Sequence, residues 1–252
     1  MAAMGVGIMT EDGRSNDLAA LMLLVASGVD VLVDDAPRNW LAPARPAAAP
    51  QVPAETPSSG GAGFDPAHYS DVPALHEALK LDGGVALGAA GRPLLFASGD
   101  PASGLMLVGD FADEFDERDG RLFSGEAGVL LDRMLGAIGR DRSSAYFTNI
   151  ACYRPAAGRV PEDAEGAACV ALARRHIALS APKLLILMGS AAIQALLGMT
   201  LNRARGKAHQ IDAFGLTLFT LATYHPRQLL DQPRLKAGAW ADLQLALEQL
   251  QA

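Results

Sequence analysis

The sequence has 252 residues and a mass of 26.2 kDa, which is enough for one domain with a sizeable core and a terminal extension. Half of the residues are hydrophobic, but no apolar run is long enough to span a bilayer, so we expect a cytoplasmic monomer without membrane contact. The net charge of −7 disfavours binding to nucleic acid, because DNA affinity depends on Lys and Arg neutralising phosphates.

The N-terminal part contains two segments of different composition. Asp17–Val29 is apolar enough for a buried helix, so residues 1–34 are expected to form a helical extension. Residues 35–66 are rich in Pro, Ala, Ser and Gly without apolar periodicity, which is typical of a flexible linker. The remaining residues, 67–252, are expected to form the main domain.

Strand and helix patterns alternate through this main domain. In chain order, the patterns predict a helix over Val72–Leu81, a strand over Pro93–Ala97, a strand over Leu105–Gly109, a helix ending near Gly139, a strand over Ala145–Ile150, a helix over Ala164–Leu179, a strand over Lys183–Gly189, a helix over Ala191–Leu197, a strand over Leu216–Thr223 and a helix over Ala237–Leu250. Such alternation favours an α/β fold, in which a central, mainly parallel four-stranded sheet lies between two helical layers.

Several polar or glycine residues stand where predicted strands end. In α/β sheets of this kind, ligands bind beyond the carboxyl ends of the strands. The residues at these ends are Gly109 with Asp110, Asn149, Gly189 with Ser190, and His225 with Pro226. Six carboxylates lie between Asp110 and Asp119, and by their charge alone they also fit a solvated loop. The coincidence at one sheet edge favours a functional site.

A local basic face is compatible with the acidic chain. Five cationic residues lie in the C-terminal third: Arg203, Arg205, Lys207, Arg227 and Arg234. If these side chains converge, they provide a patch for nucleic acid on a protein that is acidic elsewhere.

Four separated motifs carry a resemblance to a known family. LMLVG precedes the acidic loop, GRLFSGEAGVLLDRML resembles the pattern GxPFVGxAGxLLxRML, and YFTNIACYRP resembles YITNxxxxRP, while PKLLILMGSAAIQALLG and YHPRQLL complete the series. In this order, the motifs resemble the uracil-DNA glycosylase superfamily, and most closely its family 4, the iron–sulfur type. The resemblance covers most of Leu81–Leu247. It implies an enzyme of base excision repair that cleaves uracil from DNA, with uracil-containing DNA as its partner.

The resemblance assigns roles to individual residues. Phe123 matches the aromatic side chain that stacks on the extruded base, and Asn149 matches the amide that binds the polar edge of the base. Gly109 and Phe111 belong to the same base-binding set. His225 matches the motif histidine, which donates a hydrogen bond to the departing base. Taken singly, Phe123 also fits a core aromatic and Asn149 a turn cap; their joint placement favours the site.

Further roles follow from the same motifs. Asp110 occupies the position of a family glutamate, where a carboxylate positions water or stabilises the sugar cation, so it is a candidate catalytic residue with His225. Arg227 and Leu229, which follow the motif histidine, are expected to contact the DNA strand and fill the space that the base leaves. Arg205 from the basic group is a further candidate for DNA contact.

The sequence departs from family 4 at the cluster ligands. Alignment through the intact motifs puts Asp82, Val85 and Tyr153 where three of the four cysteines would stand, and leaves Cys169 as the matching one. Cys152 falls one residue early. Because an iron–sulfur cluster of this type requires four thiolates, we expect the cluster to be lost, and with it any metal or other cofactor.

The first motif is also altered, and this leaves two functional interpretations. The family pattern GEAPG is replaced by Gly109–Asp113, which puts a carboxylate where a glycine would let the backbone approach the base. One interpretation is an active, cofactor-free DNA N-glycosylase for uracil or a related deaminated base. The other is a catalytically impaired member that binds DNA, a nucleotide or a protein partner.

Overall fold

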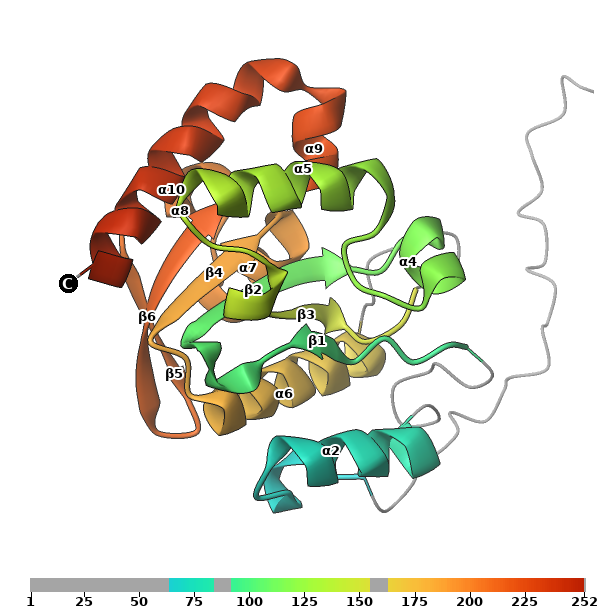
Figure 1. Ribbon diagram of the computed structural model, residues 1–252. Helices are drawn as coiled ribbons and strands as arrows, with labels where there is room; N and C mark the ends of the chain where they lie inside the picture. Colours follow the sequence, from blue (N-terminus) through green and yellow to red (C-terminus); the bar gives the residue numbers. More distant parts are fainter. Residues whose placement is uncertain (1–63, 84–91, 155–162, 252) are drawn as a thin grey trace, which may run out of the picture. The chain divides into compact units, whose positions relative to one another are not determined.

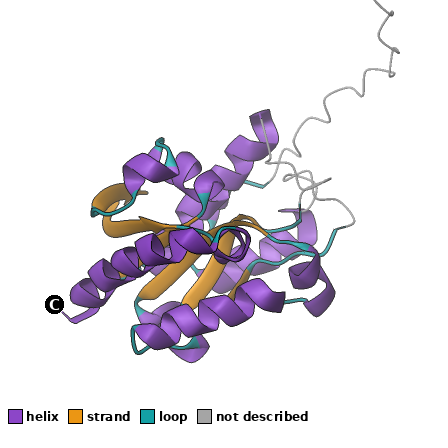
Figure 2. Ribbon diagram, turned by 90° about the horizontal axis from the view of Figure 1, so that it is seen from above, coloured by secondary structure: helices purple, strands orange, loops and turns teal. Residues whose placement is uncertain are grey.

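The structure, a computed structural model, describes residues 64–83, 92–154 and 163–251. The predicted helix over Asp17–Val29 and most of the predicted linker lie outside these ranges, so the division of the chain into extension, linker and domain stays a prediction. A sheet is sandwiched between two layers of helices (Figures 1 and 2). Within the described ranges, no helix is both long and apolar enough to cross a membrane.

The elements follow the predicted alternation. The strands are β1 (Ala97–Gly99), β2 (Leu105–Phe111), β3 (Tyr146–Ala151), β4 (Leu184–Met188), β5 (His209–Ala213) and β6 (Leu216–Thr223). The α-helices are α2 (Val72–Ala78), α4 (Glu114–Asp119), α5 (Gly125–Ala137), α6 (Asp163–Ser180), α7 (Ser190–Leu197), α8 (Leu201–Ala204), α9 (Pro226–Asp231) and α10 (Lys236–Gln251). Shorter helical turns are η1 (Pro66–His68), η2 (Leu79–Gly83), η3 (Pro101–Ser103), η4 (Arg142–Ser144) and η6 (Pro233–Leu235).

The sheet has the strand order β1-β3-β2-β4-β6-β5. Its four central strands are parallel, which confirms the predicted four-stranded parallel core. Two antiparallel edge strands, β1 and β5, extend it. β5 was not expected, because it is short and partly polar; it forms a hairpin with β6 through Phe214 and Gly215, whose φ angles of 52° and 80° suit a tight two-residue turn.

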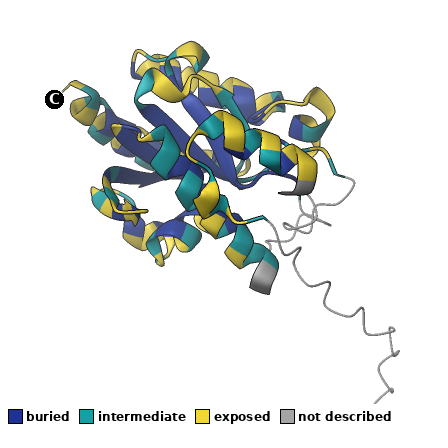
Figure 3. Ribbon diagram, turned by 90° about the horizontal axis from the view of Figure 1, so that it is seen from below, coloured by how far each residue is buried: buried dark blue, intermediate teal, exposed yellow. Residues whose placement is uncertain are grey.

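Burial on both faces explains the uniformly apolar central strands. All five residues of β4 and the first five residues of β2 are buried (Figure 3). α10 packs on β4 and β6, while α6 packs on β3 and β5, and α7 on β2, β3 and β4. The helices α5 and α9 contact each other beside the carboxyl ends of the strands. The carboxyl ends of the strands, where the predicted site residues lie, are therefore surrounded by α5, α7 and α9.

A stack of rings joins α2 to α6 across β1. The Phe96 ring lies between the His76 and His176 imidazoles, with centroid distances of 4.9 and 4.2 Å. His176 is buried, and its Nε2 shares a 2.8 Å hydrogen bond with the Tyr146 hydroxyl. Burial lowers the pKa of His176 to about 3, so this imidazole is neutral in the folded protein.

We predict that His176 contributes to acid unfolding. Because its pKa is lowered on folding, its stabilising contribution is complete above about pH 6.5 and is lost as pH falls toward 3, with a slope of up to about 1.4 kcal/mol per pH unit. The free energy of unfolding in urea, measured from pH 7 to 4, should fall less steeply for His176→Gln than for the wild type. Exposed His68→Gln is the control, and a wild-type slope in His176→Gln would contradict the prediction.

Candidate functional site

The direction of side chains at the end of β2 divides the site into two faces. We expected the strand to break at Gly109, but it continues to Phe111 and pairs Gly109 with Asn149 of β3. Successive residues of a strand point to opposite faces. Gly109 and Asn149 therefore face α5, whereas Asp110 faces α7.

Gly109 allows two site residues to approach the backbone closely. A Cβ atom at this position would lie 2.3 Å from the Asn149 amide and 2.8 Å from Cζ of Phe123. Real Cβ atoms do not approach other atoms so closely, so a side chain here would force the ring and the amide to move. Because Gly109 has no side chain, the Phe123 ring and the Asn149 amide can both lie close to its backbone over the end of β2.

The backbone of Phe123 is held in an unusual conformation. Its φ of 53° lies in the left-handed region, which non-glycine residues adopt only when their surroundings hold them there. The Arg142 guanidinium donates to the carbonyl oxygens of Leu122 (3.1 Å) and Phe123 (2.6 Å). Gly128 of α5 leaves space for the Phe123 carbonyl, since a Cβ there would lie 2.0 Å from that oxygen. The sequence analysis did not predict that Arg142 and Gly128 support Phe123. The only signal for this was the second glycine of the GEAG motif, Gly128.

The structure brings the three principal predicted residues together. The Phe123 and His225 rings are stacked, with centroids 5.5 Å apart and planes at 21°, and Phe147 contacts the Phe123 ring edge-on. Phe123, Asn149 and His225 are 3%, 2% and 7% exposed. In this conformation the His225 imidazole covers Phe123, so a stacking base must displace one ring from the other.

The hydrogen bonds of His225 define its protonation. This residue caps the N-terminus of α9, and its Nδ1 accepts a 3.2 Å hydrogen bond from the Arg227 backbone N–H. Burial, together with the nearby Arg227 charge, lowers the pKa of His225 to about 3. A neutral imidazole that accepts at Nδ1 carries its proton on Nε2. His225 is therefore a neutral hydrogen-bond donor.

Asn149 is oriented by two backbone groups. With the amide oriented so that each end meets a complementary group, its Nδ2 donates to the Thr148 carbonyl and its Oδ1 accepts from the Ala112 N–H, each at 3.1 Å. An amide has two donor hydrogens and two acceptor lone pairs, so one of each remains for a ligand. The amide is thus suited to a base edge that presents a carbonyl beside an N–H.

Arg227 lies inside the site rather than extending from it. Its guanidinium donates to the Phe111 carbonyl (3.0 Å), forms an ion pair with Asp113 (3.5 Å) and lies over the Phe111 ring, 5.4 Å from its centroid. The side chain is 30% exposed. The contacts of Arg227 therefore connect α9 to the segment after β2.

The other two residues that we expected to contact DNA, Arg205 and Leu229, have partners inside the protein. Arg205 forms a 2.6 Å ion pair with the nearly buried Asp242 and lies 3.9 Å from the centroid of the Tyr224 ring. Leu229 is 1% exposed, because it faces the core from α9. Its neighbour Leu230 is half-buried, so it is better placed than Leu229 to reach a ligand. The helical periodicity of α9, a helix that we did not predict, explains the difference.

Asp110 points away from the three principal residues. Its Oδ1 accepts a 2.8 Å hydrogen bond from the Ala192 N–H in the first turn of α7. Gly189 gives the carboxylate room, because a Cβ there would lie 2.4 Å from Oδ2. Burial raises the pKa of Asp110 above its ordinary value. Because the strand continues through Gly109, Asp110 lies on the opposite face of the sheet from Asn149, and its predicted catalytic role stays a prediction.

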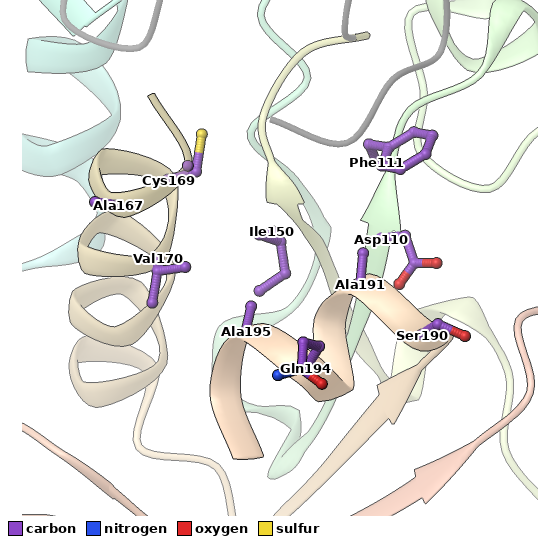
Figure 4. Close-up of a pocket in the computed structure, with 11 residues that line it drawn as sticks. Asp110, Phe111, Ile150, Ala167, Cys169, Val170, Ser190, Ala191, Gln194 and Ala195 are labelled. Atoms are coloured by element: carbon purple, nitrogen blue, oxygen red, sulfur yellow. The ribbon is translucent and has the colours of Figure 1, made fainter. Parts of the chain in front are cut away.

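A cavity of about 510 Å³ occupies this second face, between α6 and α7 (Figure 4). Its wall is mostly apolar and includes Ile150, Val170, Ala191 and Ala195, and Asp110 lies at one side. The sheet separates this cavity from the stacked Phe123 and His225 rings.

The acidic segment after β2 is a folded element. Asp113 caps α4 by accepting from the N–H groups of Phe115 and Asp116. The buried Asp116 carboxylate accepts from the backbone N–H groups of Asp113 (3.3 Å) and Ser124 (2.6 Å). These bonds attach the Phe123 loop to α4. The alternative of a solvated loop is therefore wrong for Asp113 and Asp116.

Comparison with known proteins identifies the family. The model of the Uracil DNA glycosylase superfamily matches residues 96–244, more than half of the chain. The chain belongs to this superfamily. Similar relatives are the Type-4 uracil-DNA glycosylases of Pyrobaculum aerophilum (29% identical, covering 69% of this chain and 91% of the relative), Archaeoglobus fulgidus (28%, covering 55% and 72%) and Sulfurisphaera tokodaii (30%, covering 55% and 66%).

Of the four positions that the resemblance implies as iron–sulfur cluster ligands, the structure describes the side chains of two, Tyr153 and Cys169. The buried Tyr153 hydroxyl donates to Glu165 and lies 4.0 Å from the Cys169 sulfur, while Arg92 covers the Tyr153 ring. In the described ranges, no three His, Cys, Asp or Glu side chains converge as metal ligands. A phenol, a carboxylate and one thiol are the wrong donors for such a cluster.

We predict opposite effects for two Gly→Ala substitutions in α5. Gly128→Ala should lower the free energy of unfolding by about 1–3 kcal/mol, because its Cβ collides with the Phe123 carbonyl. The control is Gly136→Ala, where nothing lies within 4 Å of the added atom, so better helix propensity should raise stability by up to about 1 kcal/mol. Urea unfolding of both variants tests this; equal effects would show that Gly128 does not support Phe123.

Proposed function

We propose that this protein is a DNA N-glycosylase that hydrolyses the bond between uracil, or a related deaminated base, and deoxyribose in base excision repair. Membership of the superfamily supports the reaction class. The observation that carries the proposal is the meeting of Phe123, Asn149 and His225 over Gly109. Together they provide an aromatic face, an amide and a neutral donor, which are the groups that an extruded base requires.

The chemistry follows from the charge that develops during cleavage. When the bond from the sugar carbon to the base nitrogen breaks, the base takes the electron pair, and negative charge spreads to its carbonyl oxygens. The Nε2–H of His225 donates to such an oxygen, while Asn149 holds the opposite polar groups. A water oxygen then bonds to the sugar carbon, and its proton neutralises the base. Removing one donor of this kind typically costs about 10²–10³ in rate.

The carboxylates around the site take supporting roles in this conformation. Asp110 caps α7, Asp113 pairs with Arg227, and Asp116 binds the Ser124 N–H. We therefore assign the larger part of catalysis to stabilisation of the departing base. A direct catalytic role for Asp110 stays a prediction, and it requires that the carboxylate leave the N-terminus of α7.

A second candidate function is a catalytically impaired member that binds a base, DNA or a protein partner. It is favoured by the same engagement of Asp110, Asp113 and Asp116, which leaves water without an evident general base among them. Closure of His225 over Phe123 also fits a module that opens only for a ligand.

A base-release assay separates the two candidates. On single-stranded oligonucleotides containing uracil, hypoxanthine or xanthine, we expect the wild type to create abasic sites at uracil. Asn149→Ala should lower the rate at least about 100-fold, since the base loses its polar partner. Exposed Asn202→Ala is the matched control and should retain wild-type turnover. Binding of uracil-containing DNA without any base release from the wild type would support the impaired module instead.

We also propose that the protein works without an iron–sulfur cluster. The Tyr153–Glu165 hydrogen bond next to Cys169 supports this, because it places a packed polar pair at one of the four ligand positions. Protein purified without oxygen should show neither iron by elemental analysis nor the visible absorbance of iron–sulfur centres. Cys169→Ala should therefore keep its base-release rate. Stoichiometric iron that Cys169→Ala abolishes would contradict the proposal.

A further inference from the structure

We propose that Arg227 is a positioning residue that sets the hydrogen-bonding state of both polar side chains of the base pocket, His225 and Asn149. The inference deepens the proposed function and rests on it for its catalytic consequence. The sequence motif suggested only a DNA contact for Arg227, whereas the structure shows three of its side-chain nitrogens directed at groups of the pocket.

The first connection is direct. Both the backbone N–H and the Nε–H of Arg227 donate to Nδ1 of His225, at 3.2 and 3.4 Å. Two donors and a positive charge at Nδ1 exclude a proton from that atom. The imidazole therefore keeps its hydrogen on Nε2, the nitrogen that must donate to the base.

The second connection passes through one peptide group. Arg227 donates through a terminal guanidinium nitrogen to the Phe111 carbonyl (3.0 Å). The N–H of the same peptide, which belongs to Ala112, donates to Oδ1 of Asn149 (3.1 Å) in the amide orientation that its neighbours require. Hydrogen bonds at the two ends of a peptide polarise each other, so Arg227 both holds and strengthens the bond that orients the amide.

The side chain at this position must be arginine for geometric reasons. Its Nε serves His225, one terminal nitrogen serves Phe111, and the other faces Asp113 at 3.5 Å. The planar guanidinium presents its donors in a fixed fork, whereas a lysine ammonium is a single point on a flexible stem. Lysine would keep the charge for a phosphate contact but lose the simultaneous bonds. Arg227→Lys therefore separates the two roles.

The tautomer of His225 provides a test that needs no turnover. Ring ¹H–¹⁵N correlation spectra, with the His225 signals assigned from a His225→Gln variant, should show one Nε2–H tautomer in the wild type. In Arg227→Lys, Nδ1 keeps the backbone donor but loses the Nε–H donor, so the Nδ1–H tautomer should appear beside it as a minor species. Arg133→Lys, an exposed site on α5, is the control and should give the wild-type spectrum. An unchanged tautomer in Arg227→Lys, with wild-type thermal stability, would overturn the proposal.

Kinetics test the catalytic consequence. Arg227→Lys should lower kcat about 100-fold through misplaced donors, with KM and the salt dependence of DNA binding nearly unchanged. If Arg227 instead serves as a phosphate contact, Arg227→Lys retains kcat, while Arg227→Gln raises KM and lowers the salt slope by about 1. A wild type without base release would reject the proposed function, and the tautomer measurement would still decide the role of Arg227.

Discussion

The pocket depends on one close approach, which brings the Phe123 ring and the Asn149 amide onto the backbone of Gly109. A base can be bound only where a flat apolar face and a polar edge lie within a few ångströms of each other, and no side chain fits between them here. The approach also demands support from behind, because Phe123 has a left-handed backbone. Arg142, Gly128 and the α4 caps supply that support, so much of the surrounding structure serves to place one ring.

Carboxylates in the acidic segment after β2 have local hydrogen-bond or ion-pair partners. Asp113 binds backbone N–H groups at the start of α4, Asp116 binds the N–H of Ser124 just after Phe123, and Glu117 forms a 3.2 Å ion pair with Arg154. The acidic segment is therefore part of the framework of the pocket. This explains how a chain of net charge −7 can carry carboxylates beside the proposed site for DNA, itself a polyanion.

Phe123, Asn149 and His225 could be predicted from their match to the family motifs. The parallel four-stranded core could be predicted from its apolar runs, which mark buried parallel strands. The direction of Asp110 could not, since a glycine at a strand end equally marks a break or a continuing strand. Arg142 and Arg227 carry no motif signal of their internal roles, because several of their partners are backbone carbonyls, which every residue type provides. β5 escaped for a related reason, because a short edge strand lacks a buried apolar pattern.

The chemical state of the two cysteine thiols follows from their burial. Burial raises the pKa of the Cys169 thiol to about 11 and that of the Cys152 thiol still further, so neither is a thiolate at neutral pH. Thiols in this state are poor nucleophiles and poor targets for peroxide. Cys169, the position at which the family resemblance implies a cluster ligand, is a buried thiol in this structure, so oxidants should leave the pocket intact.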